Sequence, residues 1–165
     1  MKKLKLSIKL KQIVSIVFLL LSVSFFILLI ANKKNMENYA SQLMKKQTTE
    51  ATKESTKSVV DSLYNYQKNG SKHKITFLEF GATGCSACKR METVMAEIRE
   101  KYPQEVNVIF LNVLLPESQI MMKYFGIAAI PTQVLLDKNG KEFFRHTGYF
   151  SEKELAKTLT IKNIN

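Results

Sequence analysis

The pattern of apolar and polar positions divides most of the chain into three parts. An apolar run without any charged side chain extends over residues 13–31. As a helix it would be about 28 Å long at ~1.5 Å per residue, close to the ~30 Å apolar core of a bilayer. Residues 32–54 are polar with scattered apolar positions, and regular periodicity begins near residue 55. We therefore expect a transmembrane anchor over 13–31, a polar linker over 32–54 and a folded domain over 55–165.

The first expected helix of this domain begins near Ser58 and ends at Gly70, which suits a left-handed cap. Five apolar residues fall on what would be its inward face: Val59, Val60, Leu63, Tyr64 and Tyr66. Their spacing lets them share one helix face.

The remaining periodicity predicts alternating strands and helices. The expected elements are a buried strand over 74–80, a helix over 85–101, a second buried strand over 106–114, a short helix over 117–125, strands over 132–136 and 141–146 joined by a turn at 138–140, and a last helix capped by Ser151 and Glu154. The first half alternates helix and strand, and the second half adds a hairpin. The order therefore predicts an α/β fold with a mixed sheet of about four strands.

Charge is concentrated next to the apolar run. The net charge is +11, and residues 1–34 hold seven lysines and no acidic residue. This bias predicts a cytoplasmic basic segment over 1–12, a single membrane pass and an extracytoplasmic domain. The alternative is a cleaved signal peptide, although the run is long for one and no convincing small-residue cleavage site follows it. The domain shows no basic stripe interleaved with aromatics, so we do not expect it to bind nucleic acid.

The candidate chemistry lies in Cys85 and Cys88, the only cysteines of the chain, in C-x-x-C spacing. They follow an expected strand and a glycine-containing loop, and they open an expected helix. Free amides and the dipole at a helix N-terminus stabilise an anion, so Cys85 is expected to be the attacking thiolate. Cys88, one turn further on, is placed to resolve a mixed disulfide.

Three other interpretations of the pair are a zinc site, a purely structural disulfide and two inert core thiols, and the position of the pair at the exit of a loop argues against the last. A zinc site needs about four ligands, and the chain offers only His73 and His146 as further nitrogen donors. A purely structural disulfide would close so short a loop that it would restrict the unfolded chain little. We therefore expect no metal and no cofactor beyond the Cys85–Cys88 dithiol itself.

Two segments resemble the thioredoxin superfamily. Residues 77–98 (FLEFGATGCSACKRMETVMAEI) are similar to its strand, active-site loop and helix, and residues 124–159, with Ile-Pro-Thr at 130–132, are similar to its tail. The resemblance covers about residues 55–162 and implies a thioredoxin fold. It also implies a cis Ile130–Pro131 peptide that faces the cysteines.

Further site residues follow from this resemblance. It implies that backbone groups of Ile130 pair with an extended substrate segment, and that Gly84 and Thr132 contribute to substrate binding. It gives Glu79, six residues before Cys85, the role of a proton relay to Cys88. Strand alternation supports a buried Glu79, because its neighbours on both faces are apolar; the alternative is an acid on a solvent-facing side.

The chain also departs from the family pattern. Gly84 stands where a tryptophan usually precedes the first cysteine, and Ser-Ala separates the two cysteines in place of Gly-Pro. Phe110 stands where a buried lysine often accompanies the acid. These departures affect the expected redox potential and the partner surface more than the exchange chemistry.

The pattern is most similar to membrane-tethered bacterial thioredoxin-like proteins that receive electrons from a thiol-reductant-conducting membrane transporter. The resemblance implies a monomeric extracytoplasmic protein-disulfide reductase that keeps substrate cysteines reduced, for instance during cytochrome c maturation. A disulfide oxidase or isomerase, and a non-catalytic binding or assembly module, remain as alternatives.

Overall fold

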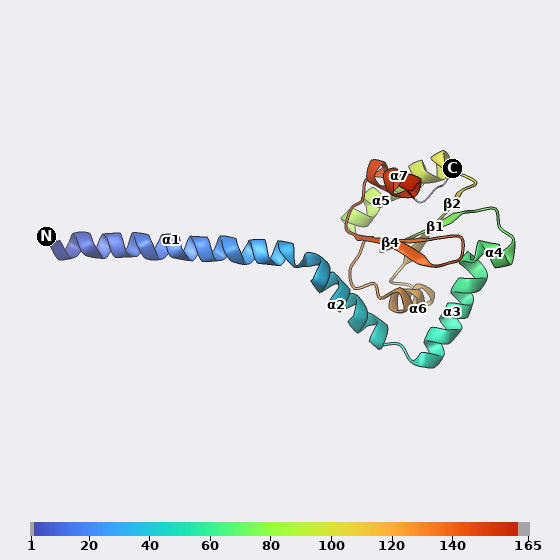
Figure 1. Ribbon diagram of the computed structural model, residues 1–165, viewed down its shortest axis with the longest axis horizontal. Helices are drawn as coiled ribbons and strands as arrows, with labels where there is room; N and C mark the ends of the chain where they lie inside the picture. The colour runs from blue at the N-terminus through green and yellow to red at the C-terminus, as the bar shows by residue number, and fades with distance from the viewer. Residues whose placement is uncertain (1, 162–165) are drawn as a thin grey trace. The chain divides into compact units, whose positions relative to one another are not determined.

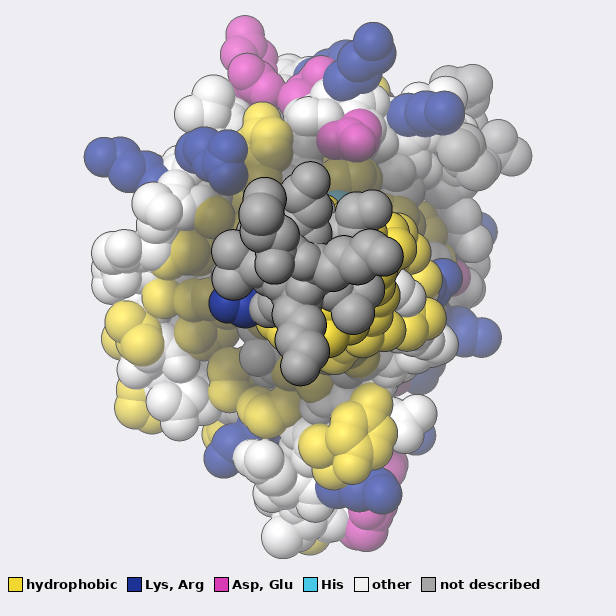
Figure 2. All heavy atoms as spheres, turned by 90° about the vertical axis from the view of Figure 1, so that its left-hand side faces the viewer, with side chains coloured by type: hydrophobic (Ala, Val, Ile, Leu, Met, Phe, Trp, Pro, Cys, Tyr) yellow, Lys and Arg dark blue, Asp and Glu magenta, His cyan; other side chains and the backbone are white. Residues whose placement is uncertain are grey.

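The computed structural model describes residues 2–161, so the outer ends of the segments expected over 1–12 and 55–165 lie outside the described residues. The chain divides into one unit that ends at Ala40 and a second that begins at Ser41. In the first unit, helix α1 (Lys2–Ala31) contains a segment, Leu10–Ala31, that is long and apolar enough to cross a membrane. Its apolar side chains are exposed along the helix. Figure 2 views the chain from the N-terminal end of this helix, with hydrophobic side chains in yellow. The helix is therefore compatible with the expected anchor. A cleaved signal sequence shares this length and composition.

The segment expected as a polar linker is largely helical. Helix α2 (Lys33–Lys46) is followed by α3 (Glu50–Tyr64), whose N-cap Thr49 accepts a hydrogen bond from the amide of Thr52 at 3.2 Å. From Ser41 on, this segment belongs to the same compact unit as the sheet, and the Ser41 hydroxyl accepts a hydrogen bond from Arg145 at 3.3 Å. The buried positions here include small polar residues such as Thr56, so no apolar stripe marks the packing in the sequence.

The helix expected from Ser58 to Gly70 is interrupted. It ends as α3 at Tyr64, and a short α4 (Tyr66–Asn69) follows, which Gly70 ends in the left-handed conformation with φ +74°, as predicted. Only part of the expected inward face is buried, because Val60 and Tyr64, four residues apart, take the inward positions on α3. Val59 and Leu63 are 48% and 52% exposed, so the five residues do not form one buried helix face.

The second unit contains the expected four-stranded mixed sheet, in the order β2-β1-β3-β4. Its strands are β1 (Ile75–Gly81), β2 (Val106–Asn112), β3 (Thr132–Leu136) and β4 (Glu142–Thr147). β1 is parallel to β2 and antiparallel to β3, which is antiparallel to β4. β2 is an edge strand with most of its residues half-buried, so the prediction of a second fully buried strand is wrong.

Helices cover both faces of this sheet (Figure 1). α5 (Ser86–Lys101) and α7 (Glu152–Ile161) pack on one face, and α3 and α6 (Pro116–Phe125) pack on the other. The odd-numbered residues of β1 contribute to the first core and the even-numbered ones to the second. The predicted capping box is present, with the Ser151 amide donating to the Glu154 carboxylate at 3.2 Å. The thioredoxin fold predicted from the sequence is thus confirmed.

Gly126 provides a test of how the helices before the sheet pack. It ends α6 with φ +67°, and a Cβ placed there would lie 2.5 Å from the Ser41 carbonyl oxygen. We expect Gly126→Ala to lower the free energy of unfolding by about 3 kcal/mol, because it adds this clash to the cost of the left-handed backbone. Gly70→Ala is the matched control, with φ +74° and nothing within 4 Å, and should lose only about 1 kcal/mol. Denaturant unfolding of the full chain measures both, and equal losses would contradict the contact with Ser41.

Candidate active site

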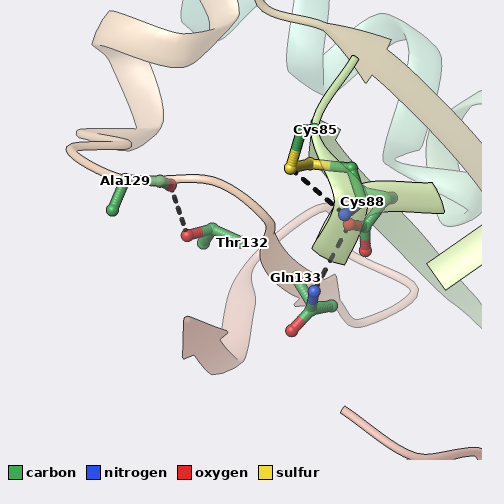
Figure 3. Close-up of a disulfide and its surroundings, with 6 residues drawn as sticks. Cys85, Cys88, Ala129, Thr132 and Gln133 are labelled. Carbon is green, nitrogen blue, oxygen red and sulfur yellow. Dashed lines mark hydrogen bonds between the residues drawn. A yellow bond between two sulfur atoms is a disulfide. The ribbon is translucent and has the colours of Figure 1, made fainter. Parts of the chain in front are cut away.

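The two cysteines occupy the start of α5, directly after the loop that follows β1. Cys85 is the N-cap and Cys88 lies in the first turn, so the helix begins at Ser86, one residue later than predicted. In this structure the two are joined as a disulfide with their Cα atoms 5.2 Å apart (Figure 3). The Cys85 sulfur accepts a hydrogen bond from the Cys88 amide at 3.1 Å, which places it among the free amides of the helix N-terminus.

The two sulfur-bearing residues differ in access. Cys85 is half-buried, whereas Cys88 is only 2% exposed. Gly84, directly before Cys85, is exposed at φ +86°, with no atom within 4 Å of the point where a Cβ would lie. A reactant can therefore approach Cys85 past Gly84, while Cys88 is shielded.

The cis-proline loop lies at the same end of the sheet. Phe80 of β1 pairs with Thr132 of β3, so the end of β1 that leads to the cysteines adjoins the start of β3. The Ile130–Pro131 peptide is cis, as the resemblance implied. The Pro131 carbonyl accepts a hydrogen bond from the Gly148 amide at 2.8 Å, which ties this loop to the end of β4.

The expected substrate-binding residues of this loop have different surroundings. Ile130 is half-buried and packs against the core beneath α3 and α6. Thr132 is buried, its hydroxyl donates to the Ala129 carbonyl at 2.8 Å, and it lies 3.1 Å from the Thr147 hydroxyl (Figure 3). The Thr132 side chain therefore stabilises the loop from within. Any substrate contact at this position would involve the backbone.

Glu79 has no exposed surface, as the strand pattern predicted. It lies between Phe110 of β2 and Gln133 of β3 in the sheet register. The Gln133 side-chain amide donates a hydrogen bond to Glu79 Oε1 at 3.3 Å, and Oε2 has no hydrogen-bond partner among the described residues. Burial raises the pKa of Glu79 to about 8, and the hydrogen bond from Gln133 opposes part of that rise.

Cys88 of α5 packs against the face of β1 on which the Glu79 side chain lies. Side chains alternate along a strand, so positions 79 and 81 point to the same side. A Cβ on Gly81 would lie 3.4 Å from the Cys88 sulfur and 2.8 Å from a ring carbon of Phe110. The Cys88 sulfur thus packs on the Gly81 backbone, two residues along from the buried carboxyl, and the ring of Phe110 closes the side where a lysine was expected from the family pattern.

Sequence reasoning missed two residues near the site. Gln133 is the polar member of an otherwise apolar buried stretch, and its place opposite Glu79 follows only from the register. Tyr149 is exposed, follows Gly148, and has the Arg90 guanidinium 4.5 Å from its ring centre. An exposed aromatic residue after a hairpin strand was the signal available for Tyr149.

The structure does not bring the histidines to the cysteines. His73 Nδ1 lies 2.9 Å from the Ser71 hydroxyl, and the ring of His146 stacks on Phe150. Among residues 2–161, no group of three or more His, Cys, Asp or Glu side chains is arranged to hold a metal ion. The zinc alternative therefore has no ligand set in the described part of the chain.

Comparison with known proteins adds the family. The family model described as "Thioredoxin-like domain" matches residues 59–161. The chain belongs to the thioredoxin-like family. This thioredoxin-like chain is 28% identical over 111 residues to "Thioredoxin-like protein HCF164, chloroplastic" of Arabidopsis thaliana, a match that covers 67% of this chain and 41% of that relative. It therefore spans less than half the length of that protein.

Other relatives are matched over more of their length. "Thioredoxin H-type 1" of Nicotiana tabacum is 32% identical over 94 residues, covering 57% of this thioredoxin-like chain and 71% of the relative. The solved structure of a mutant thioredoxin from Halobacterium salinarum superposes with a TM-score of 0.50 at 23% identity, covering 56% and 77% of the two chains, and shows the shared fold. Family membership and the bonded C-x-x-C pair together support thiol–disulfide oxidoreductase activity.

Proposed function

We propose that the protein is a membrane-tethered, extracytoplasmic protein-disulfide reductase that uses the Cys85–Cys88 dithiol. The difference in access between the two cysteines is the observation that carries this proposal. Cys85 lies at a helix N-terminus where a thiolate is stabilised and a substrate can reach it. Cys88 is buried one turn away, where it meets only the Cys85 sulfur of a mixed disulfide.

In this mechanism two electrons pass from the dithiol to the substrate. The Cys85 thiolate attacks a substrate disulfide, forms a mixed disulfide and releases the first substrate thiolate. Cys88 then loses its proton and attacks the Cys85 sulfur, which releases the second substrate thiolate. The products are a substrate dithiol, after the two thiolates take up protons, and the Cys85–Cys88 disulfide.

Glu79 serves as the proton acceptor in the second step. It lies on the same face of β1 as Cys88, and its pKa of about 8 is close to the ~8.5 of a free thiol. The Glu79 carboxyl can therefore take up and release a proton near neutral pH, which suits a relay that works in both directions. The charged form of Glu79 is the active base in reduction of substrate.

The substrate would lie across Gly84 and the cis-proline loop. Because Pro131 has no N–H, the backbone of Ile130 is free to pair with an extended substrate segment, as in strand addition. Gly84 keeps the approach to Cys85 open, and the internal hydrogen bonds of Thr132 hold the loop in shape. The substrate class is then a protein segment with an accessible disulfide.

The anchor and the electron source complete the proposal. The lysine-rich start of the chain and the apolar segment Leu10–Ala31 support a single pass through the cytoplasmic membrane with the domain outside. A membrane thiol-reductant transporter would re-reduce Cys85–Cys88, with cytochrome c maturation as one process served.

After expression in bacteria, the full chain should stay in the membrane pellet on alkaline extraction; release into the supernatant would contradict the anchor.

The reduction potential of the full chain in detergent micelles tests the direction of electron flow. Equilibration with glutathione or dithiothreitol buffers of known ratio, followed by alkylation of free thiols, gives the value. A reductase is expected to lie nearer about −270 mV than about −120 mV. A value near the upper figure would contradict the reductase and favour an oxidase or isomerase with the same cysteines.

A further inference from the structure

Gln133 is a polar side chain in the middle of the sheet to which the mechanism above gives no part. It has no exposed surface, and the three residues that follow it on β3, Val134, Leu135 and Leu136, are fully buried and apolar. Burying an amide costs free energy unless it forms hydrogen bonds. Its one side-chain hydrogen bond among the described residues is donated to Glu79, so the interaction of this amide in the sheet is with the Glu79 carboxyl.

The groups that surround the Glu79 carboxyl come from four elements. Gln133 faces it from β3, and Phe110, which has no charge, lies beside it on β2. Cys88 of α5 is the titratable group on the same face of β1. On β4, His146 is paired with Gln133 in the register, but its ring stacks on Phe150 and its Nε2 lies 3.2 Å from the Tyr149 carbonyl oxygen. The Gln133 amide is thus the hydrogen-bond donor that reaches this carboxyl in the described part of the chain.

The hydrogen bond distinguishes the two carboxyl oxygens. Oε1 accepts from the Gln133 amide at 3.3 Å, while Oε2 is buried and no group in residues 2–161 forms a hydrogen bond with it. An amide N–H bonds more strongly to a carboxylate than to a neutral acid, so the contact favours the form that can accept a proton. The hydrogen bond also holds Oε1 in place and leaves Oε2 available to accept or release a proton.

We propose that Gln133 is a positioning residue for proton transfer: it holds Glu79 by Oε1 and leaves Oε2 as the oxygen that takes the proton of Cys88. This inference rests on the proposed function. In the step itself, the Cys88 S–H bond breaks, an O–H bond forms on Glu79, and the Cys88 thiolate attacks the Cys85 sulfur, which breaks the bond to the substrate sulfur and releases the substrate thiolate. The Gln133 amide keeps its hydrogen bond throughout and exchanges no proton.

The test replaces Gln133 by methionine, which is close in length and unbranched but has no donor. The full chain in detergent micelles is titrated by infrared spectroscopy, with the protonated carboxyl band of Glu79 assigned by its loss in Glu79→Gln. Without the donor, the midpoint of this band is expected to rise by about one pH unit. Gln133→Asn, whose amide is one methylene short of Glu79, should shift it in the same direction and serves if Gln133→Met does not fold.

The same variants are then mixed, in reduced form, with dithiobis(2-nitrobenzoic acid). Attack by Cys85 releases one thionitrobenzoate, and resolution by Cys88 releases the second, so the two steps are observed separately. In Gln133→Met the first release should keep its rate, and the second should slow about tenfold at pH 7, since about tenfold less Glu79 is ionised. The control Leu135→Val alters the same strand face without touching the carboxyl and should change neither the midpoint nor this ratio.

The outcomes separate the inference from the function beneath it. An unmoved midpoint in folded Gln133→Met, or an equal shift in Leu135→Val, overturns the role of Gln133 while leaving the cysteine chemistry intact. A wild-type chain that releases no second thionitrobenzoate overturns the proposed function itself. A shifted midpoint with a slowed second release alone supports the inference.

Discussion

Cys85→Ser is expected to abolish disulfide reduction, whereas Cys88→Ser is expected to stop the cycle at a mixed disulfide. The reason is the unequal access of the two sulfurs: the half-buried Cys85 meets the substrate, and the buried Cys88 meets only the adduct. Insulin reduction by the full chain in micelles, with dithiothreitol as the electron source, measures turnover. Cys85→Ser should give no rate above the dithiothreitol background.

The mixed disulfide provides the second readout. Cys88→Ser should accumulate covalent adducts with substrate proteins on non-reducing gels, and dithiothreitol should release them. Thr93→Ala, at an exposed position further along α5, is the matched control and should keep both turnover and release. Turnover that survives in Cys85→Ser, or adducts that form through Cys88 in that variant, would reverse the assignment of the two sulfurs. No turnover in the wild type would favour a non-catalytic module.

Glu79→Gln is expected to stabilise the fold, and to do so increasingly as the pH rises. The folded-state pKa of Glu79 is about 8, above the value of 4.5 for an unperturbed carboxyl, so the folded chain binds this proton more tightly than the unfolded one. Ionisation of this carboxyl therefore does not affect stability below pH 4.5. Between pH 4.5 and 8 the free energy of unfolding of the wild type falls by about 1.4 kcal/mol per pH unit. Above pH 8 the loss levels off at roughly 4–5 kcal/mol. Glutamine does not titrate and avoids this loss.

Denaturant unfolding of the disulfide form of both chains at several pH values measures the difference. The variant and the wild type should be similar in stability near pH 4.5 and diverge up to about pH 8. Glu92→Gln, at an exposed position on α5, should follow the wild type throughout. Parallel curves for Glu79→Gln and the wild type would show that the carboxyl is not held in its neutral form by burial. The expected gain in stability comes with a slower second step in catalysis.

Local sequence rules predicted those parts of the molecule that depend on local structure. The end of α4 at Gly70 and the capping box at Ser151 follow from backbone preferences within a few residues. The strand Thr132–Leu136 has the predicted bounds because a proline and a turn delimit it. The cysteine pair at a helix start could be found in the same way.

Features that depend on distant pairing could not be predicted in this way. β2 has the composition of a buried strand, yet it lies at the edge because no described strand pairs with its outer side. Small polar residues such as Thr48 pack at buried positions, so residues 32–54 gave no apolar stripe. Gln133 becomes informative only once the register places it opposite Glu79. In each case the deciding neighbour is far away in the sequence.

The aromatic ring of Phe110 beside Glu79 has a consequence for the conditions in which the protein works. A carboxyl paired with a lysine would owe its proton affinity partly to a charge, and dissolved ions weaken such attraction where solvent reaches it. Here burial and a neutral amide set that affinity instead. The acid–base behaviour of the buried step should therefore be the same in dilute and in saline surroundings.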